Sequence, residues 1–254
     1  DNPKGEFSQF TPRGTNHEYA IEHYNDKFYI ITNFKAKNNR LMETPTFNTH
    51  IDNWVEIVPH RDEVQILDLD VFENHLVINE RIDGLSQIRI FNHRNGKDNY
   101  LKFNDDVYTS YLSINKEINT NILRYVFTSL TEPLSTFDYN MDTGETKLLK
   151  KQEIIGGYES KNYKSIRLIG TSRDGNKIPI SLVYKKDLRK SGAQNLLLYA
   201  YGSYGSTIDP YFSLSRLSLL DRGFIFAIAH VRGSQIYGRK SYEDGKLLNK
   251  KNSF

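Results

Sequence analysis

A glycine- and tyrosine-rich segment, residues 199–206 (YAYGSYGS), is the part of the sequence best suited to hold a reacting group. It comes directly after an apolar, strand-like run, and in open α/β sheets ligands bind in the loops that leave the carboxyl ends of strands. Glycines in such a loop let the backbone approach a ligand closely. The hydroxyl of Tyr201 could donate a hydrogen bond to a developing oxyanion. The pattern fits equally a tight glycine turn whose tyrosines pack in the core or at an interface.

A second segment, residues 230–234 (HVRGS), also comes after an apolar run. His230 could act as a base, although an isolated histidine beside an arginine is more typical of a structural role. Arg232 could bind a carboxylate or fix a loop through its fork of hydrogen-bond donors. We favour a structural role for Arg232 in a loop near the site.

Several kinds of chemistry are excluded within these 254 residues. The sequence has no cysteine, so it holds no disulfide, cysteine-ligated metal or cysteine nucleophile. This composition fits a reducing compartment, and we expect a cytoplasmic protein. Asp68 and Asp70 would share one face of a strand, but no histidine or further acid is suitably spaced, so we expect no metal. Phosphate-loop and dinucleotide motifs are absent, and we expect no cofactor.

No G-x-S-x-G motif occurs, which is the strand-to-helix elbow that presents a serine nucleophile in α/β-hydrolases. Ser203 and Ser206 lie among glycines but lack that context. Charge is nearly balanced, with 34 Lys and Arg against 31 Asp and Glu and a mean hydropathy of −0.60. The basic residues are dispersed, so we expect no nucleic-acid partner. No apolar run approaches the roughly 18 residues that span a bilayer, so we expect no membrane partner.

The elements that precede these segments are short strands. Three similar runs, residues 26–33, 73–80 and 123–130, recur at intervals of roughly 45–50 residues, and polar turns separate the strands. This period, with about four strands per unit, is typical of β-propeller blades, while a β-sandwich with regular strand spacing is the alternative. Propellers typically close with about 4–8 blades. We therefore expect an all-β partial propeller of about three blades over residues 1–158.

The pattern changes in the second half. Residues 165–184 predict a β-hairpin that turns at residues 173–176 (RDGN). Two continuous apolar runs, residues 195–201 and 224–230, predict strands buried on both faces. The spacing of apolar residues between them predicts a helix over residues 212–223 that ends at Gly223. The order is a hairpin and then a β-α-β unit.

The second half closely resembles the oligopeptidase B branch of the prolyl oligopeptidase family of serine peptidases. The matching segments are residues 171–175, 198–205, 212–223, 230–233, 242–246 and 250–254. The resemblance implies a seven-bladed propeller that caps an α/β-hydrolase domain, and cleavage of short peptides after Arg or Lys by acyl transfer. We accordingly expect residues 159–254 to be the start of the hydrolase domain, and short basic peptides to be the substrates.

The resemblance also assigns roles to single residues. Tyr201 matches the tyrosine that completes the family's oxyanion hole. Asp209 matches one of two acids linked to binding a basic residue next to the cleavage site, while the second of these positions is Tyr211 here. After Arg232 the sequence reads Gly-Ser-Gln-Ile where the family usually has Gly-Gly-Gly-Glu.

In the family the catalytic serine, aspartate and histidine lie beyond the position of Phe254. We therefore expect this chain to be an internal fragment of a longer peptidase, inactive by itself because it lacks the catalytic triad. Two other interpretations stay open: a non-catalytic propeller module that binds peptides or proteins, and a degenerate relative that never had a nucleophile.

Overall fold

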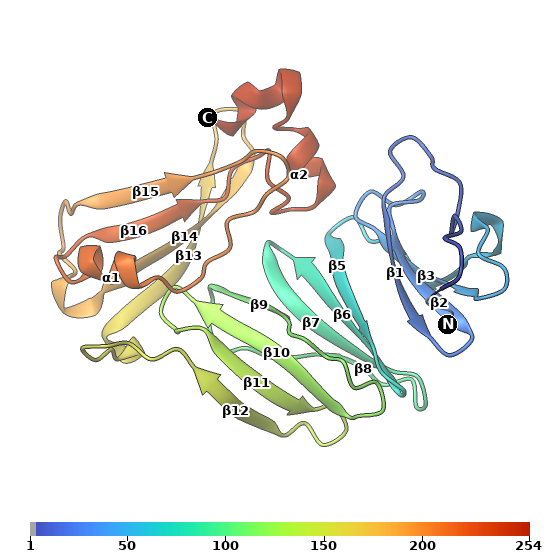
Figure 1. The fold of residues 1–254 in the computed structure, drawn as a ribbon. Coiled ribbons are helices and arrows are strands. Elements are labelled where there is room, and N and C mark those ends of the chain that lie inside the picture. Colours follow the sequence, from blue (N-terminus) through green and yellow to red (C-terminus); the bar gives the residue numbers. More distant parts are fainter. Residues whose placement is uncertain (1–3) are drawn as a thin grey trace.

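The computed structural model describes residues 4–254, so residues 1–3 of the expected propeller half lie outside it. Three four-stranded antiparallel sheets succeed one another along the chain, and a fourth, mixed sheet comes last (Figure 1). No helix in residues 4–254 is both long and apolar enough to cross a membrane. The fold is the expected one, a partial β-propeller and then a short α/β segment.

Each of the first three sheets is a meander whose strands pair in the order of the sequence. The repeated runs of the sequence form the second strand of each blade, which explains their regular spacing. Blade one is β1 (Tyr19–Tyr24), β2 (Lys27–Thr32), β3 (Arg40–Pro45) and β4 (Val55–Val58), with η1 (Ile51–Asn53) before β4; blade two is β5 (Val64–Val71), β6 (His75–Ile82), β7 (Leu85–Asn92) and β8 (Asp98–Tyr100); blade three is β9 (Tyr108–Leu112), β10 (Ile122–Ser129), β11 (Ser135–Asn140) and β12 (Thr146–Lys151).

Two hydrophobic clusters of this half lie between blades, and a smaller one lies within blade one. Successive side chains of a strand point to opposite faces of its sheet. On β6, Leu76 and Ile78 pack with Leu41 of blade one, whereas Val77 packs with Leu123 of blade three. Blade two is therefore buried on both faces.

The fourth sheet has the strand order β13-β14-β16-β15, in which β15 (Leu196–Ala200) and β16 (Ile225–Ala229) are parallel. The strands β13 (Tyr163–Thr171) and β14 (Lys177–Lys185) form the predicted hairpin. Helix α1 (Leu214–Leu220) connects β15 to β16, as predicted, although it is shorter than the predicted range. The remaining elements are η2 (Ser160–Asn162), η3 (Lys186–Leu188), α2 (Arg239–Glu243) and η4 (Leu247–Ser253).

Gly223 ends the α1 turn, as the sequence predicts. Its φ is +82°, in the left-handed region that favours glycine. Its N–H donates to the carbonyl of Leu220, and the N–H of Phe224 donates to that of Leu219. This pair of bonds is the Schellman arrangement, which satisfies carbonyls at a helix end.

One expectation about burial is wrong. β16 is largely buried, but every residue of β15 is exposed, and Leu198 retains 56% of its accessible surface. The reason is position. β15 pairs only with β16 and forms the edge of its sheet within the described residues, so its apolar composition does not place it in a core.

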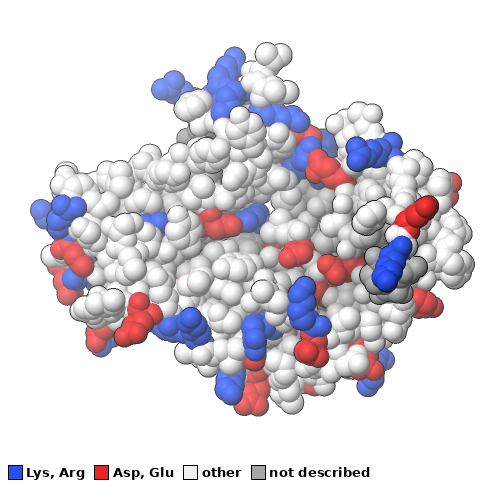
Figure 2. Space-filling model, viewed as in Figure 1, with Lys and Arg blue, Asp and Glu red and all other residues white. Residues whose placement is uncertain are grey.

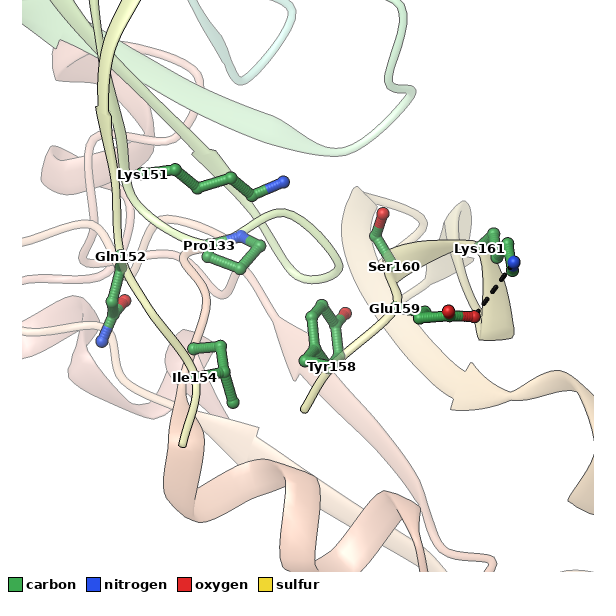
Figure 3. Close-up of a pocket in the computed structure, with 8 residues that line it drawn as sticks. All are labelled: Pro133, Lys151, Gln152, Ile154, Tyr158, Glu159, Ser160 and Lys161. Carbon is green, nitrogen blue, oxygen red and sulfur yellow. Dashed lines mark ion pairs between the residues drawn. The ribbon is translucent and has the colours of Figure 1, made fainter. Parts of the chain in front are cut away.

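The segment that connects the two halves lines a hollow of about 380 Å³, which lies between the end of β12 and η2 (Figure 3). Glu159 and Lys161 form an ion pair of 3.0 Å at its rim. This hollow lies at the junction and does not include Tyr201. The domain division between residues 158 and 159 falls in this segment and stays a prediction. The lining residues are Pro133, Lys151, Gln152, Ile154, Tyr158, Glu159, Ser160 and Lys161.

Candidate oxyanion loop and its supports

The two loops singled out in the sequence lie against each other. Because β15 and β16 run parallel, the segments that follow them leave the sheet at the same edge. The N–H of Gly205 donates to the carbonyl of Gly233 at 3.0 Å, and the N–H of Gln235 donates to the carbonyl of Gly205 at 3.2 Å. The segment after Tyr201 and the segment after Arg232 therefore form one backbone unit.

Glycine is required where these backbones touch. A Cβ on Gly202 would lie 2.3 Å from the carbonyl oxygen of Arg232, and a Cβ on Gly233 would lie 2.1 Å from the carbonyl oxygen of Gly202. Gly245, at the end of α2, packs in the same way, because its Cβ would lie 2.2 Å from the backbone nitrogen of Gly233. Three segments thus meet backbone to backbone around Gly202.

Tyr201 stands at the end of β15 with 40% of its surface exposed. Its hydroxyl has no hydrogen-bond partner among residues 4–254, so the phenol O–H is available as a donor. Tyr204, on the same loop, is 90% exposed. Neither ring packs in a core of the described residues, which argues against the core form of the turn alternative and leaves its interface form open.

Asp209 is held by an arginine of the propeller. Arg81 of β6 donates to both carboxylate oxygens, with distances of 2.7 and 3.0 Å. Arg81 is buried, whereas Asp209 is only partly so. Any further basic group that contacts this carboxylate would therefore share it with Arg81. The substrate-binding role of Asp209 stays a prediction. If Asp209 has that role, it acts while paired with Arg81.

Sequence reasoning missed Arg81. The one signal present was a charged residue near the end of a predicted strand, just before the Asp83-Gly84 turn. Both turn residues have positive φ, 48° and 75°, as a two-residue hairpin turn that matches strand twist requires. Arg81 also donates to the carbonyl of Gly84, at 3.4 Å. Nothing in the sequence alone pairs it with Asp209, which lies 128 positions further along the chain.

Arg232 links its loop to the β13–β14 hairpin. Its Nη1 donates to Oδ2 of Asp174 at 2.6 Å. Hydrogen bonds from Ser172, and then from Arg232, hold the pKa of Asp174 well below its usual range. This contact fits a structural role, and the assignment stays a prediction.

His230 is buried, with 5% of its surface exposed, and its Nε2 lies 2.7 Å from the hydroxyl oxygen of Ser181. Burial lowers the pKa of His230 to about 4. The imidazole is therefore neutral at pH 7, and its pKa is far from the operating pH that suits a general base. The geometry favours a structural role.

The acidic pair on β5 is divided between two environments. Asp68 is exposed, whereas Asp70 is half-buried and accepts a hydrogen bond from Asn115 at 2.7 Å. Burial raises the pKa of Asp70 to about 6. Within residues 4–254 no three His, Asp or Glu side chains are grouped so as to hold a metal ion. Both signs of charge are interspersed on the face shown in Figure 2, with Lys and Arg gathered over the C-terminal segment at its top.

Comparison with known proteins adds the family. Residues 1–152 match the model described as "Prolyl oligopeptidase, N-terminal beta-propeller domain", and residues 210–254 match the model described as "Prolyl oligopeptidase family". The chain is 41% identical over 252 residues to "Dipeptidyl aminopeptidase BI" of Pseudoxanthomonas mexicana, covering 98% of this chain and 35% of that protein. It is 34% identical over 236 residues to "Protease 2" of Moraxella lacunata, covering 93% of this chain and 34% of that protein.

Solved structures agree. The fold superposes with a TM-score of 0.89 on oligopeptidase B from Leishmania major, at 33% identity, covering 96% of this chain and 35% of that one. The closed form of Trypanosoma brucei oligopeptidase B with covalently bound antipain gives a TM-score of 0.88 at 36% identity, covering 96% of this chain and 36% of that one. The chain spans about a third of the length of these relatives. The propeller model alone covers more than half of the residues, and the chain belongs to the prolyl oligopeptidase family.

Proposed function

We propose that this chain is part of a serine peptidase that cleaves short peptides after Arg or Lys by acyl transfer. In that reaction a serine attacks the peptide carbonyl, and hydrogen-bond donors stabilise the negative charge that develops on the carbonyl oxygen. This chain would supply one donor, the Tyr201 hydroxyl. The nucleophile, the triad aspartate and the triad histidine would come from the rest of the protein.

One observation carries the proposal. Tyr201 is an exposed phenol without a hydrogen-bond partner in the described residues, and it is attached to a backbone that cannot move easily because Gly202 is packed against Arg232. An oxyanion donor needs this combination, a free O–H on a preorganised support.

The basic preference is supported by Asp209 and by the similarity to protease 2 and oligopeptidase B. Asp209 lies where the propeller half contacts the last sheet, but Arg81 already pairs with both of its carboxylate oxygens. Tyr211, at the second acidic position of the resemblance, is exposed and adds no charge. We therefore propose a basic subsite that is weaker than one built from two free acids.

The test uses the full-length protein and a peptide substrate with arginine before the scissile bond. Tyr201→Phe should lower kcat on the order of 100-fold, the usual worth of one oxyanion donor, with a smaller change in KM. Tyr204→Phe is the matched control, because Tyr204 is an exposed tyrosine of the same loop. Equal kcat values for Tyr201→Phe and the parent would rule out the oxyanion role.

A second candidate comes from the 41% identity to a protein named dipeptidyl aminopeptidase. Such an activity would release dipeptides from a free amino end. Digesting one arginine-containing peptide in two forms, with a free and with an acetylated amino terminus, separates the candidates. An oligopeptidase cuts both forms after arginine, whereas a dipeptidyl aminopeptidase cuts only the free form.

A further inference from the structure

The last element, η4, holds the loop that carries Tyr201. The ammonium of Lys250 donates to the carbonyl oxygen of Gly202 and lies 3.3 Å from the hydroxyl oxygen of Ser253. The hydroxyl of Ser253 donates in turn to the carbonyl oxygen of Arg232 at 2.7 Å. One short segment thus contacts the carbonyls of both loops.

The contact with Lys250 matters because the residue next to Tyr201 is a glycine. Gly202 must be glycine to fit against Arg232, yet glycine is the residue with the greatest backbone freedom. Packing against Arg232 restricts this freedom, and a donor that binds the Gly202 carbonyl restricts it further. A charged N–H donor makes a stronger hydrogen bond than a neutral one, and Gly202 is buried, where such a bond is little weakened by water.

Lys250 differs from most of its neighbours in η4. Leu247, Leu248 and Lys251 are exposed, whereas Lys250 is half-buried with its ammonium turned to Gly202. A lysine of a merely solvated surface would leave its ammonium in water. The segment therefore directs one of its lysines to the loop of Tyr201.

We propose that Lys250 is a positioning residue, which fixes the Gly202 carbonyl and thereby the direction of the Tyr201 hydroxyl. This inference rests on the proposed oxyanion role of Tyr201. Lys250 touches no reacting atom. It acts through the backbone, so its removal affects the chemical step more than substrate binding.

In the full-length protein, Lys250→Met should lower kcat by about 10-fold, since small misplacements of a catalytic group are costly, and leave KM within about 2-fold. Lys251→Met, one residue along and exposed, is the matched control and should leave both constants unchanged. Thermal unfolding and circular dichroism verify that each variant is folded. Should Lys250→Met fail to fold, Lys250→Gln, which keeps an N–H donor without the charge, takes its place with a smaller expected loss.

A double-mutant cycle separates positioning from general destabilisation. If Lys250 acts through Tyr201, its loss should cost less than about 2-fold in kcat once Tyr201→Phe is already present, because interacting residues are not additive. The same fold-loss in both backgrounds would overturn the inference. An unchanged kcat for Tyr201→Phe alone would instead reject the proposed function, so the two failures are distinguishable.

Discussion

The strands β6 and β15 differ in an unexpected way: the polar strand is buried and the apolar strand is exposed. β6 contains His75, Asn79, Glu80 and Arg81, yet all its residues but the last are buried. β15 is Leu-Leu-Leu-Tyr-Ala, yet every residue is exposed. β6 lies inside its sheet and between two other blades, whereas β15 is the edge of its sheet in the described residues (Figure 1). Position among neighbours, more than hydrophobicity, decides which strand is buried here.

The charges of β6 tolerate burial because they are paired. Glu80, fully buried, accepts hydrogen bonds from Arg61, from Arg89 at 3.4 Å and from the hydroxyl of Tyr100 at 2.6 Å. A buried charge without such partners would cost several kcal/mol. The network thus makes a polar strand compatible with a core position.

The largest expected effect comes from breaking this network. In the 254-residue chain, Glu80→Ala should lower the free energy of unfolding by about 3 kcal/mol, because Arg61 and the Tyr100 hydroxyl lose their buried acceptor, while Arg89 keeps Asp98. Leu198→Ser on β15 should change it by less than about 1 kcal/mol, since the side chain is already exposed. Urea unfolding of both variants measures the difference. Similar losses would show that β15 is more buried than the structure has it.

The second effect is a loss of stability at the end of β15, where an exposed strand leads into a closely packed loop. Gly202→Ala should destabilise the chain by about 1–3 kcal/mol, because the added methyl overlaps the Arg232 carbonyl and forces the backbone to shift. Gly175→Ala is the matched control. Its φ is +82° but nothing lies within 4 Å of the added methyl, so only the backbone strain of about 1 kcal/mol remains. Equal losses for the two variants would contradict the packing described around Gly202.

The last effect concerns pH, and its sign differs between the two regions. Asp70, in blade two, has a native pKa of about 6 against an ordinary value of 3.8, so the native state holds its proton longer. Its contribution to stability is present below about pH 4 and is lost as pH rises to about 6. His230 has a native pKa of about 4 against 6.5, so its contribution is present above 6.5 and is lost as pH falls towards 4.

Thermal unfolding of Asp70→Asn and His230→Gln between about pH 4 and about pH 7 checks both signs. Relative to the parent, Asp70→Asn should gain melting temperature as pH rises, and His230→Gln should gain it as pH falls. Differences that do not change with pH would mean that neither group titrates as its burial requires.

The sequence was sufficient to predict the blade repeat, the hairpin and the β-α-β unit, because each depends on local periodicity and turn residues such as Gly223. It also predicted that the segments of Tyr201 and Arg232 lie at strand ends. The pairing of Arg81 with Asp209 could not be predicted, because those residues lie 128 positions apart and meet only in the folded chain. The exposure of β15 was missed because an apolar run indicates a strand but not its place in the sheet.

The arrangement of the blades has a further consequence for cooperativity. Each blade shares its core with the blade beside it, so the stability of this half resembles a sum of blade terms and neighbour terms, as in a one-dimensional chain of coupled units. Blade two takes part in two such couplings, and blades one and three in one each among the described residues. Blade two, which carries Arg81 and through it the loop of Asp209, is the blade whose loss removes both of these couplings.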